Sequence, residues 1–293
     1  MKLRLRERRL ELEPGRPLLM GIVNAGPDSF SDPGSRSLAE LKERALGLAA
    51  DGARLIDVGG ESGRTDREAV PEAEEAERVV PLVESLAAEG LLVSVDTWRA
   101  PVARAALEAG AAMINDVSAL SDPGVAEACA ATGAGLVVTH TRVPPKTKAY
   151  PDYDDVVADV ALLLRERSGA AGAAGVDEDQ LVLDPGIDLA KSPAESVEVL
   201  RRLSELHELG RPLLLAVSRK DFLGALTERS PAERDAATLA AVGAASEGGA
   251  HILRVHDVAA ASDYLQVRAA LAGDEAVPEG PLSDDLRREP ASG

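Results

Sequence analysis

Short runs of apolar residues alternate with longer amphipathic stretches along most of the chain. The apolar runs are continuous and do not alternate with polar residues, which is typical of parallel strands buried on both faces. They predict eight strands, at residues 18–24, 54–58, 91–96, 112–116, 135–140, 181–184, 212–217 and 251–255. The amphipathic stretches predict helices at residues 38–51, 70–88, 100–109, 122–132, 154–171, 193–208, 232–247 and 258–272.

A Gly-Ala pair recurs where a helical stretch meets the next apolar run. It is found at residues 52–53, 110–111, 133–134 and 249–250. Glycine suits the left-handed conformation just past a helix C-terminus, so these pairs indicate helix ends. Ser37, Ser192 and Ser230 each begin a Ser-x-x-Glu capping box, which indicates helix starts.

Eight alternating strand and helix units predict an α/β fold, a (β/α)8 TIM barrel in one domain. A doubly wound open sheet is the rival, but no G-x-G-x-x-G motif follows any predicted strand. Polar residues at or just beyond the strand ends also favour the barrel, because its active site lies at that face: Asn24, Asp57, Asp96, Asn115, His140, Asp184, Lys220, Arg254 and His256.

The two ends of the chain lie outside the repeat. Residues 1–17 form an N-terminal extension, where we expect a strand pair that closes the barrel floor. Residues 18–273 make up the barrel. Residues 274–293 are polar and rich in Pro and Gly near their start, so we expect a flexible C-terminal tail.

The composition narrows the functional classes. The 293 residues carry 32 Lys and Arg against 50 Asp and Glu, a formal net charge of −18. That charge argues against nucleic-acid and membrane partners. No apolar run approaches the ~20 residues that span a bilayer. The single cysteine, Cys129, excludes an internal disulfide and a thiolate metal site. We expect a soluble, cytoplasmic protein.

Two groups of strand-end residues predict a binding site. Asp96, Asn115, Asp184 and Lys220 combine carboxylate acceptors, an amide and a cation, a set that suits a flat, nitrogen-rich heterocycle. Taken singly, each would more often be a satisfied polar group at a strand end, but four at one barrel mouth favour a pocket.

The second group lies beside the last two strands, where barrel enzymes often hold phosphate. It contains Arg254, His256, Arg219 and Asn24, and it predicts an anion site. The Gly- and Ser-rich loop after Asn24 and the loop that carries Arg64 are candidate mobile covers. His140 lacks companions that would make it a metal ligand.

Seven motifs in the chain resemble dihydropteroate synthase, in that family's order, over about residues 15–272. They lie at residues 20–32, 56–62, 94–97, 114–117, 183–187, 218–220 and 254–258. The resemblance implies a TIM barrel that forms a homodimer and joins 6-hydroxymethyl-7,8-dihydropterin diphosphate to 4-aminobenzoate, with release of diphosphate, in folate biosynthesis. It also implies Mg²⁺ as a cofactor.

The resemblance also implies roles for individual residues. Pterin binding falls to Asp96, Asn115, Asp184 and Lys220. The diphosphate and Mg²⁺ region falls to Asn24, Arg254 and His256, with Asn24 as the metal ligand. Ser218 and Arg64 lie near the aminobenzoate and loop contacts, and the catalytic group is Lys220, Arg254, His256 and Asp96. Arg219, from the predicted anion group, is a further candidate substrate contact.

The departures from the family pattern fall mostly in the two loops and on the aminobenzoate side. They include Gly26 and Gly63, where the family has threonine, Thr65, where it has proline, and Leu189 and Ala190, where it has Phe-Gly. We therefore expect normal pterin diphosphate binding and a weaker acceptor step.

Three other functions stay open at this point. One is a paralogue that binds pterin but has lost or changed its acceptor. Another is a non-catalytic binding protein. The third is a methyltetrahydrofolate-dependent methyltransferase, which Arg254 and His256 argue against because a methyl donor brings no diphosphate.

Overall fold

Eight parallel strands form the centre of the molecule. The computed structural model describes residues 1–26, 28, 29, 32, 33, 37–61, 65, 67–280, 286 and 287. The sheet order is β10-β9-β8-β7-β6-β3-β12-β11. The strands are β3 (Leu18–Asn24), β6 (Ala53–Gly59), β7 (Val93–Asp96), β8 (Met113–Asp116), β9 (Gly135–Thr139), β10 (Leu181–Asp184), β11 (Leu214–Leu215) and β12 (Ile252–Val255).

The sheet closes on itself between its first and last strands. A parallel bridge pairs Leu183 with Leu213, and the Leu183 amide donates to the Pro212 carbonyl oxygen at 2.9 Å. These contacts join β10 to the segment that leads into β11. The predicted (β/α)8 barrel is confirmed, and the open sheet is wrong.

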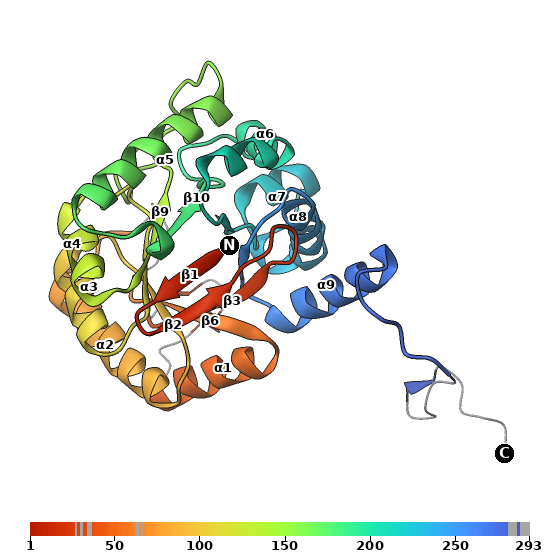
Figure 1. The fold of residues 1–293 in the computed structure, drawn as a ribbon, viewed down its shortest axis with the longest axis horizontal. Helices are drawn as coiled ribbons and strands as arrows, with labels where there is room; N and C mark the ends of the chain where they lie inside the picture. Colours follow the sequence, from red (N-terminus) through yellow and green to blue (C-terminus); the bar gives the residue numbers. More distant parts are fainter. Residues whose placement is uncertain are drawn as a thin grey trace.

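Helices surround the strands in chain order (Figure 1). They are α1 (Leu38–Ala50), α2 (Glu72–Ala88), α3 (Ala100–Glu108), α4 (Pro123–Thr132), α5 (Val156–Ala173), α6 (Pro193–Arg201), α7 (Asp221–Thr227), α8 (Asp235–Glu247) and α9 (Val258–Ala272). Short 3-10 helices occur at η1 (Glu178–Gln180), η2 (Leu203–Leu209) and η3 (Pro231–Glu233), and β4 (Asp28–Ser29) pairs with β5 (Asp32–Pro33).

Two helix predictions need correction. The helix expected at 193–208 is α6 followed by η2, because Arg202 (φ −108°, ψ 21°) leaves the helical region. The short α7 was not predicted. Its first turn is held from a distant loop, since the amide of Phe222 donates to Asp188 Oδ1 at 3.2 Å, and no local capping signal marks its start.

The Gly-Ala junctions have the backbone that their sequence predicts. Their glycines have φ values of +112° (Gly52), +107° (Gly110), +68° (Gly133) and +89° (Gly249). Side chains other than glycine rarely adopt such angles, so glycine allows each helix to turn into the next strand within a few residues.

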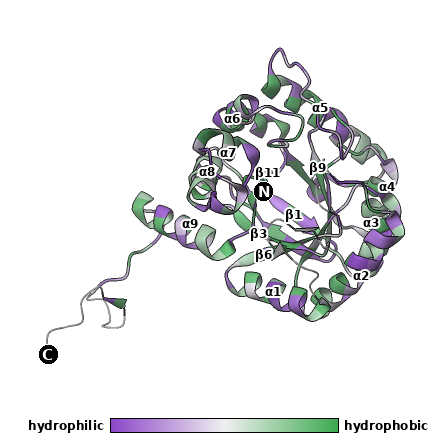
Figure 2. Cartoon of the chain, turned by 180° about the vertical axis from the view of Figure 1, so that it is seen from behind, coloured by the Kyte–Doolittle hydropathy of each residue, from purple (hydrophilic) through white to green (hydrophobic). Residues whose placement is uncertain are grey.

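Two apolar layers hold the barrel together. The outer layer lies between strands and helices, where residues such as Val58, Leu82 and Leu136 are fully buried. The strands are mostly hydrophobic and the helices carry both kinds of residue (Figure 2), as expected when helices cover a closed sheet. The inner layer fills the barrel: Leu3, Leu5, Leu10, Leu12, Met20, Leu55, Ala112, Met113, Val137, Val182, Leu214 and Ile252.

The N-terminal residues plug one end of the barrel. β1 (Lys2–Leu5) and β2 (Arg8–Glu11) form an antiparallel pair. Leu3 and Leu5 are buried in the inner layer, and a Cβ on Gly135 would lie 2.5 Å from the Leu5 side chain, so a glycine at the start of β9 leaves room for the plug. Figure 1 shows the pair lying across the ring of strands.

At the other end of the chain, residues 274–280 contain no helix or strand, and residues 281–285 and 288–293 lie outside the described residues. The flexible tail and the exact domain limits stay predictions. No helix in the described part of the chain is long and apolar enough to cross a membrane.

Replacement of a plug residue tests the role of the hairpin. Leu5→Ala should lower the free energy of unfolding by about 2–5 kcal/mol, since it opens a cavity in the inner layer. Leu162→Ala is the matched control, because this leucine is 59% exposed on α5, and it should change stability by less than about 0.5 kcal/mol. Urea denaturation measures both. Equal midpoints for the two variants would contradict a stabilising plug.

Candidate active site

A cavity of about 790 Å³ opens at the C-terminal ends of the strands. Its size falls in the range of small-molecule sites. The predicted site residues within the described part of the chain line it: Asn24, Asp96, Asn115, Asp184, Ser218, Arg219, Lys220, Arg254 and His256. Arg64 lies outside the described residues. The structure thus brings the two predicted groups together, while their individual roles stay predictions.

Arg254 joins three strands beneath this cavity. Its Nε donates to Asp57 Oδ2 at 2.6 Å, and its Nη2 donates to Asp96 Oδ2 at 2.9 Å. The fully buried Asp57 lies on β6, and β3 separates that strand from β12. Burial lowers the pKa of Arg254, but the two carboxylates more than compensate, so its net pKa rises and the guanidinium stays charged.

The two acids share this one guanidinium. Burial raises the pKa of Asp96, and the nearby Asp57 raises it further, while Arg254 opposes the shift. The pair therefore holds more potential negative charge than Arg254 alone balances. A second cation or a proton from a ligand would stabilise this part of the cavity.

Asn115 is oriented by the same buried acid. Its Nδ2 donates to Asp57 Oδ2 at 3.2 Å. The amide must face the carboxylate with its nitrogen, because Asp57 already accepts from Arg254 and offers no proton when ionised. Asn115 Oδ1 is buried and finds no hydrogen-bond partner among the described residues. A ligand donor in the cavity would satisfy this oxygen.

Asp184 ends β10, and Lys220 lies just before α7, beyond β11. Asp184 Oδ1 accepts from the Gly186 amide at 2.7 Å, and Lys220 Nζ donates to the Ile187 carbonyl oxygen at 3.0 Å. Burial raises the pKa of Asp184, although the Gly186 amide and Lys220 lower it. Gly186 has φ +69°, and a Cβ there would overlap with the His140 carbonyl oxygen, so only glycine fits this turn.

His256 and Ser218 form a hydrogen-bonded pair, with 2.9 Å between His256 Nδ1 and Ser218 Oγ. Burial and the cation of Arg254 lower the pKa of His256 to about 3, so the imidazole is neutral near pH 7. It offers an anion a hydrogen bond and no charge. Arg219 is partly exposed, and its Nε pairs with Asp235 Oδ1 at 3.1 Å.

Sequence reasoning assigned no role to several residues of this site. Asp57 is a strand-end residue in the motif at residues 56–62. Its contact with Arg254 reaches across β3, so only the sheet order reveals it. Glu61 pairs with Arg99 at 2.8 Å and with Lys146 at 2.9 Å. Lys146 lies in the loop between β9 and α5, and no pattern in the sequence marked it.

Most of the family departures lie at the cavity. Gly26, Thr65, Leu189 and Ala190 line it, and Gly63 lies outside the described residues. A Cβ on Gly26 would lie 3.3 Å from the Gly60 carbonyl oxygen, which is a tight contact. A larger residue at position 26 would therefore need a small shift of the neighbouring backbone.

Comparisons with known proteins agree with this geometry. Residues 20–256 match the family model described as pterin binding enzyme. Dihydropteroate synthase of Escherichia coli strain K12 is 40% identical over 259 residues, which cover 87% of this chain and 92% of that protein.

Two solved structures have the same fold. Xanthomonas albilineans dihydropteroate synthase with 4-aminobenzoic acid is 46% identical, with a TM-score of 0.85 and coverage of 95% of this chain and 100% of that one. Burkholderia cenocepacia dihydropteroate synthase complexed with 7,8-dihydropteroate is 38% identical, with a TM-score of 0.85 and coverage of 93% and 96%.

The chain therefore belongs to the pterin binding enzymes. Within them it is a member of the dihydropteroate synthases, and it is an enzyme of the transferase class.

The buried Arg254–Asp57 pair and the half-exposed Arg219–Asp235 pair should contribute differently to the free energy of unfolding. Asp57→Ala removes the buried oxygen that accepts from both Arg254 Nε and Asn115 Nδ2, so the free energy of unfolding should fall by about 3–5 kcal/mol. Asp235→Ala breaks the half-exposed pair with Arg219 and should cost less than about 1 kcal/mol. Denaturant titrations of the two variants and the wild type give both values. A loss for Asp57→Ala no larger than that for Asp235→Ala would contradict the bridging role.

Proposed function

We propose that this cavity joins 6-hydroxymethyl-7,8-dihydropterin diphosphate to 4-aminobenzoate and releases diphosphate. The observation that carries the proposal is the meeting of two chemically different groups in one cavity. Asn115, Asp184 and Lys220 suit a pterin ring. The residues that suit an anion are Ser218, Arg219, Arg254 and His256. Membership of the dihydropteroate synthases supports the reaction, and nothing in the structure favours the paralogue, the methyltransferase or the non-catalytic binder.

The pterin ring binds by matched donors and acceptors. The free Oδ1 of Asn115 and the carboxylate of Asp184 accept hydrogen bonds from the ring edge. Lys220 meets a carbonyl oxygen or ring nitrogen with its ammonium group. A cation on the pterin methylene would be stabilised by the carboxylates of Asp57 and Asp96, because Arg254 alone does not balance the charge of both.

The leaving diphosphate binds beside the last two strands. Arg254 provides a permanent positive charge, and Ser218 and His256 provide neutral hydrogen bonds. Arg219 lies at the rim and can exchange its contact with Asp235 for a phosphate oxygen. These residues hold the diphosphate as its C–O bond to the pterin methylene breaks. The aniline nitrogen of 4-aminobenzoate then forms a bond to the methylene cation and loses one proton.

Mg²⁺ completes the proposed anion site. The side chain of Asn24 lines the cavity, and its amide oxygen is a hard ligand of the kind that Mg²⁺ prefers. Among the described residues, no three His, Cys, Asp or Glu side chains are grouped to hold a metal. Asn24 would therefore hold the ion together with the substrate phosphates, and the ion would neutralise charge on the diphosphate.

The acceptor step is the weaker half of the proposed reaction. Leu189, Ala190 and Gly26 line the cavity, at positions where the family has phenylalanine, glycine and threonine. Fewer contacts remain for the aromatic acid, so we expect a raised KM for 4-aminobenzoate with ordinary affinity for the pterin diphosphate.

A coupled measurement of turnover and binding tests this function. The wild type should form 7,8-dihydropteroate, whereas Asp184→Asn should bind the pterin roughly tenfold to a hundredfold more weakly, because a charge-assisted hydrogen bond is lost. Asp263→Asn makes the same change at an exposed position of α9 and should match the wild type. Calorimetry gives the affinities. Unchanged pterin affinity in Asp184→Asn would remove this residue from the pocket.

Titration of diphosphate with and without Mg²⁺ tests the metal proposal. Mg²⁺ should strengthen diphosphate binding to the wild type, and Asn24→Ala should reduce that enhancement by about tenfold. Binding without Mg²⁺ should hardly change, since Arg254 remains. The same enhancement in both proteins would show that Asn24 is not a ligand.

The assembly and location of the protein are further proposals. We propose a homodimer, which the family resemblance implies and which the exposed apolar residues Val267 and Leu271 of α9 support. The cytoplasmic location stays an expectation from the sequence.

A further inference from the structure

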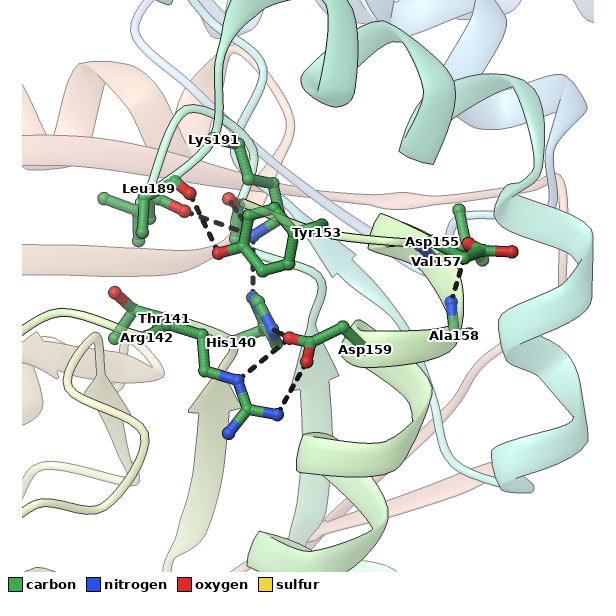
Figure 3. Close-up of polar contacts among 12 residues, drawn as sticks. His140, Thr141, Arg142, Tyr153, Asp155, Val157, Ala158, Asp159, Leu189 and Lys191 are labelled. Carbon is green, nitrogen blue, oxygen red and sulfur yellow. Dashed lines mark hydrogen bonds and ion pairs between the residues drawn. The ribbon is translucent and has the colours of Figure 1, made fainter. Parts of the chain in front are cut away.

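A buried lysine lies behind the wall of the cavity. Residues 186–190 line the cavity, and Lys191 follows them with its side chain turned away into the protein, where only 2% of the residue is exposed. A buried ammonium group is costly unless its three donors are satisfied. Here Nζ donates to the Gly186 carbonyl oxygen (3.0 Å), to the Leu189 carbonyl oxygen (3.1 Å) and to His140 Nδ1 (2.7 Å). Figure 3 labels Lys191 with Leu189 and His140.

The contact with Lys191 determines the proton position on His140. An ammonium group can only donate, so His140 Nδ1 accepts and the ring proton lies on Nε2. Nε2 then donates to Asp159 Oδ1 at 2.8 Å. Arg142 binds both oxygens of Asp159, at 2.9 and 2.7 Å. The result is a line of side chains in which Asp159, on α5, pairs with Arg142 and orients His140, and His140 in turn contacts Lys191 (Figure 3). Burial lowers the pKa of Lys191 to about 7, and the carboxylates of Asp184 and Asp159 oppose that shift.

The wall that Lys191 holds has an unfavourable backbone. Asp188 (φ +64°) and Ala190 (φ +52°) are in the left-handed region without being glycine. Such residues persist only where the surroundings determine their conformation. Lys191 binds the carbonyl groups of Gly186 and Leu189, and the Tyr153 hydroxyl donates to the Ala190 carbonyl oxygen at 2.9 Å.

We propose that Lys191 is a positioning residue for the acceptor, and that it acts through the carbonyl groups of the 186–190 wall. This inference rests on the proposed function, because it names the residue that shapes the side of the cavity assigned to 4-aminobenzoate. Leu189 and Ala190 face the acceptor. Their backbone conformation is held by Lys191 and Tyr153, and His140 holds Lys191. Lys191 itself does not line the cavity and contacts no substrate.

Steady-state kinetics with Lys191→Met test the proposal. The KM for 4-aminobenzoate should rise about fivefold to tenfold, as expected for one or two lost hydrogen bonds, and the KM for the pterin diphosphate should change by less than about twofold. Tyr153→Phe removes one contact with the same wall and leaves the buried charges intact. It should raise the acceptor KM in the same direction by about twofold to fivefold.

Leu5→Ala is the control for general destabilisation, because it weakens the barrel at the plugged end. It should leave both KM values unchanged. Equal increases for the two substrates in Lys191→Met, or the same acceptor effect in Leu5→Ala, would overturn the positioning role. Loss of fold in Lys191→Met leaves Tyr153→Phe as the deciding variant, and an unchanged acceptor KM there would also overturn it.

Hydrogen–deuterium exchange separates this inference from the proposed function. In the protein without substrates, peptides that span residues 185–192 should exchange faster in Lys191→Met and in Tyr153→Phe than in the wild type or in Leu5→Ala. Faster exchange in these two variants, with a wild type that makes no dihydropteroate, would support the role of Lys191 in ordering residues 186–190 and refute the proposed reaction. Unchanged exchange in both variants would refute that role of Lys191, whatever the activity of the protein.

Discussion

The bridge between Arg254 and the two acids Asp57 and Asp96 is the constraint on which the site depends. One guanidinium satisfies carboxylates from two other strands, and β3 lies between β12 and β6. Because Asp57 also holds the amide of Asn115, one carboxylate orients both Arg254, which we propose binds the diphosphate, and Asn115, which we propose binds the pterin ring. Breaking it would disturb both halves of the cavity at once.

Most of the fold could be predicted from the sequence, because continuous apolar runs and Gly-Ala junctions are local signals. The eight strands and the helix ends at Gly52 and Gly133 follow from such signals. The start of α7 does not, since Asp188 holds its first amides from a loop more than thirty residues earlier. The break after α6 depends on the backbone angles of Arg202, and no residue pattern in the sequence predicts those angles.

The candidate site also contains residues that the sequence predicts and contacts that it does not. Strand-end residues such as Asp184 and Arg254 could be predicted, since a barrel brings all its C-terminal strand ends to one face. Their partners could not, because Arg254 meets Asp57 across a strand and His140 meets Lys191 from the next strand's loop. The sequence around His140 shows only that metal-binding companions are lacking, whereas in the fold its partners are the buried Lys191 and Asp159. Charge pairing inside a folded protein depends on distances that the sequence does not contain.

A crystal structure of the chain with 7,8-dihydropteroate, diphosphate and Mg²⁺ tests the central claim most directly. The account predicts the pterin edge within hydrogen-bond distance of Asn115 Oδ1 and the Asp184 carboxylate, with diphosphate on Arg254 and the benzoate beside Leu189. A pterin ring bound away from Asn115 and Asp184, or a diphosphate without contact to Arg254, would contradict it.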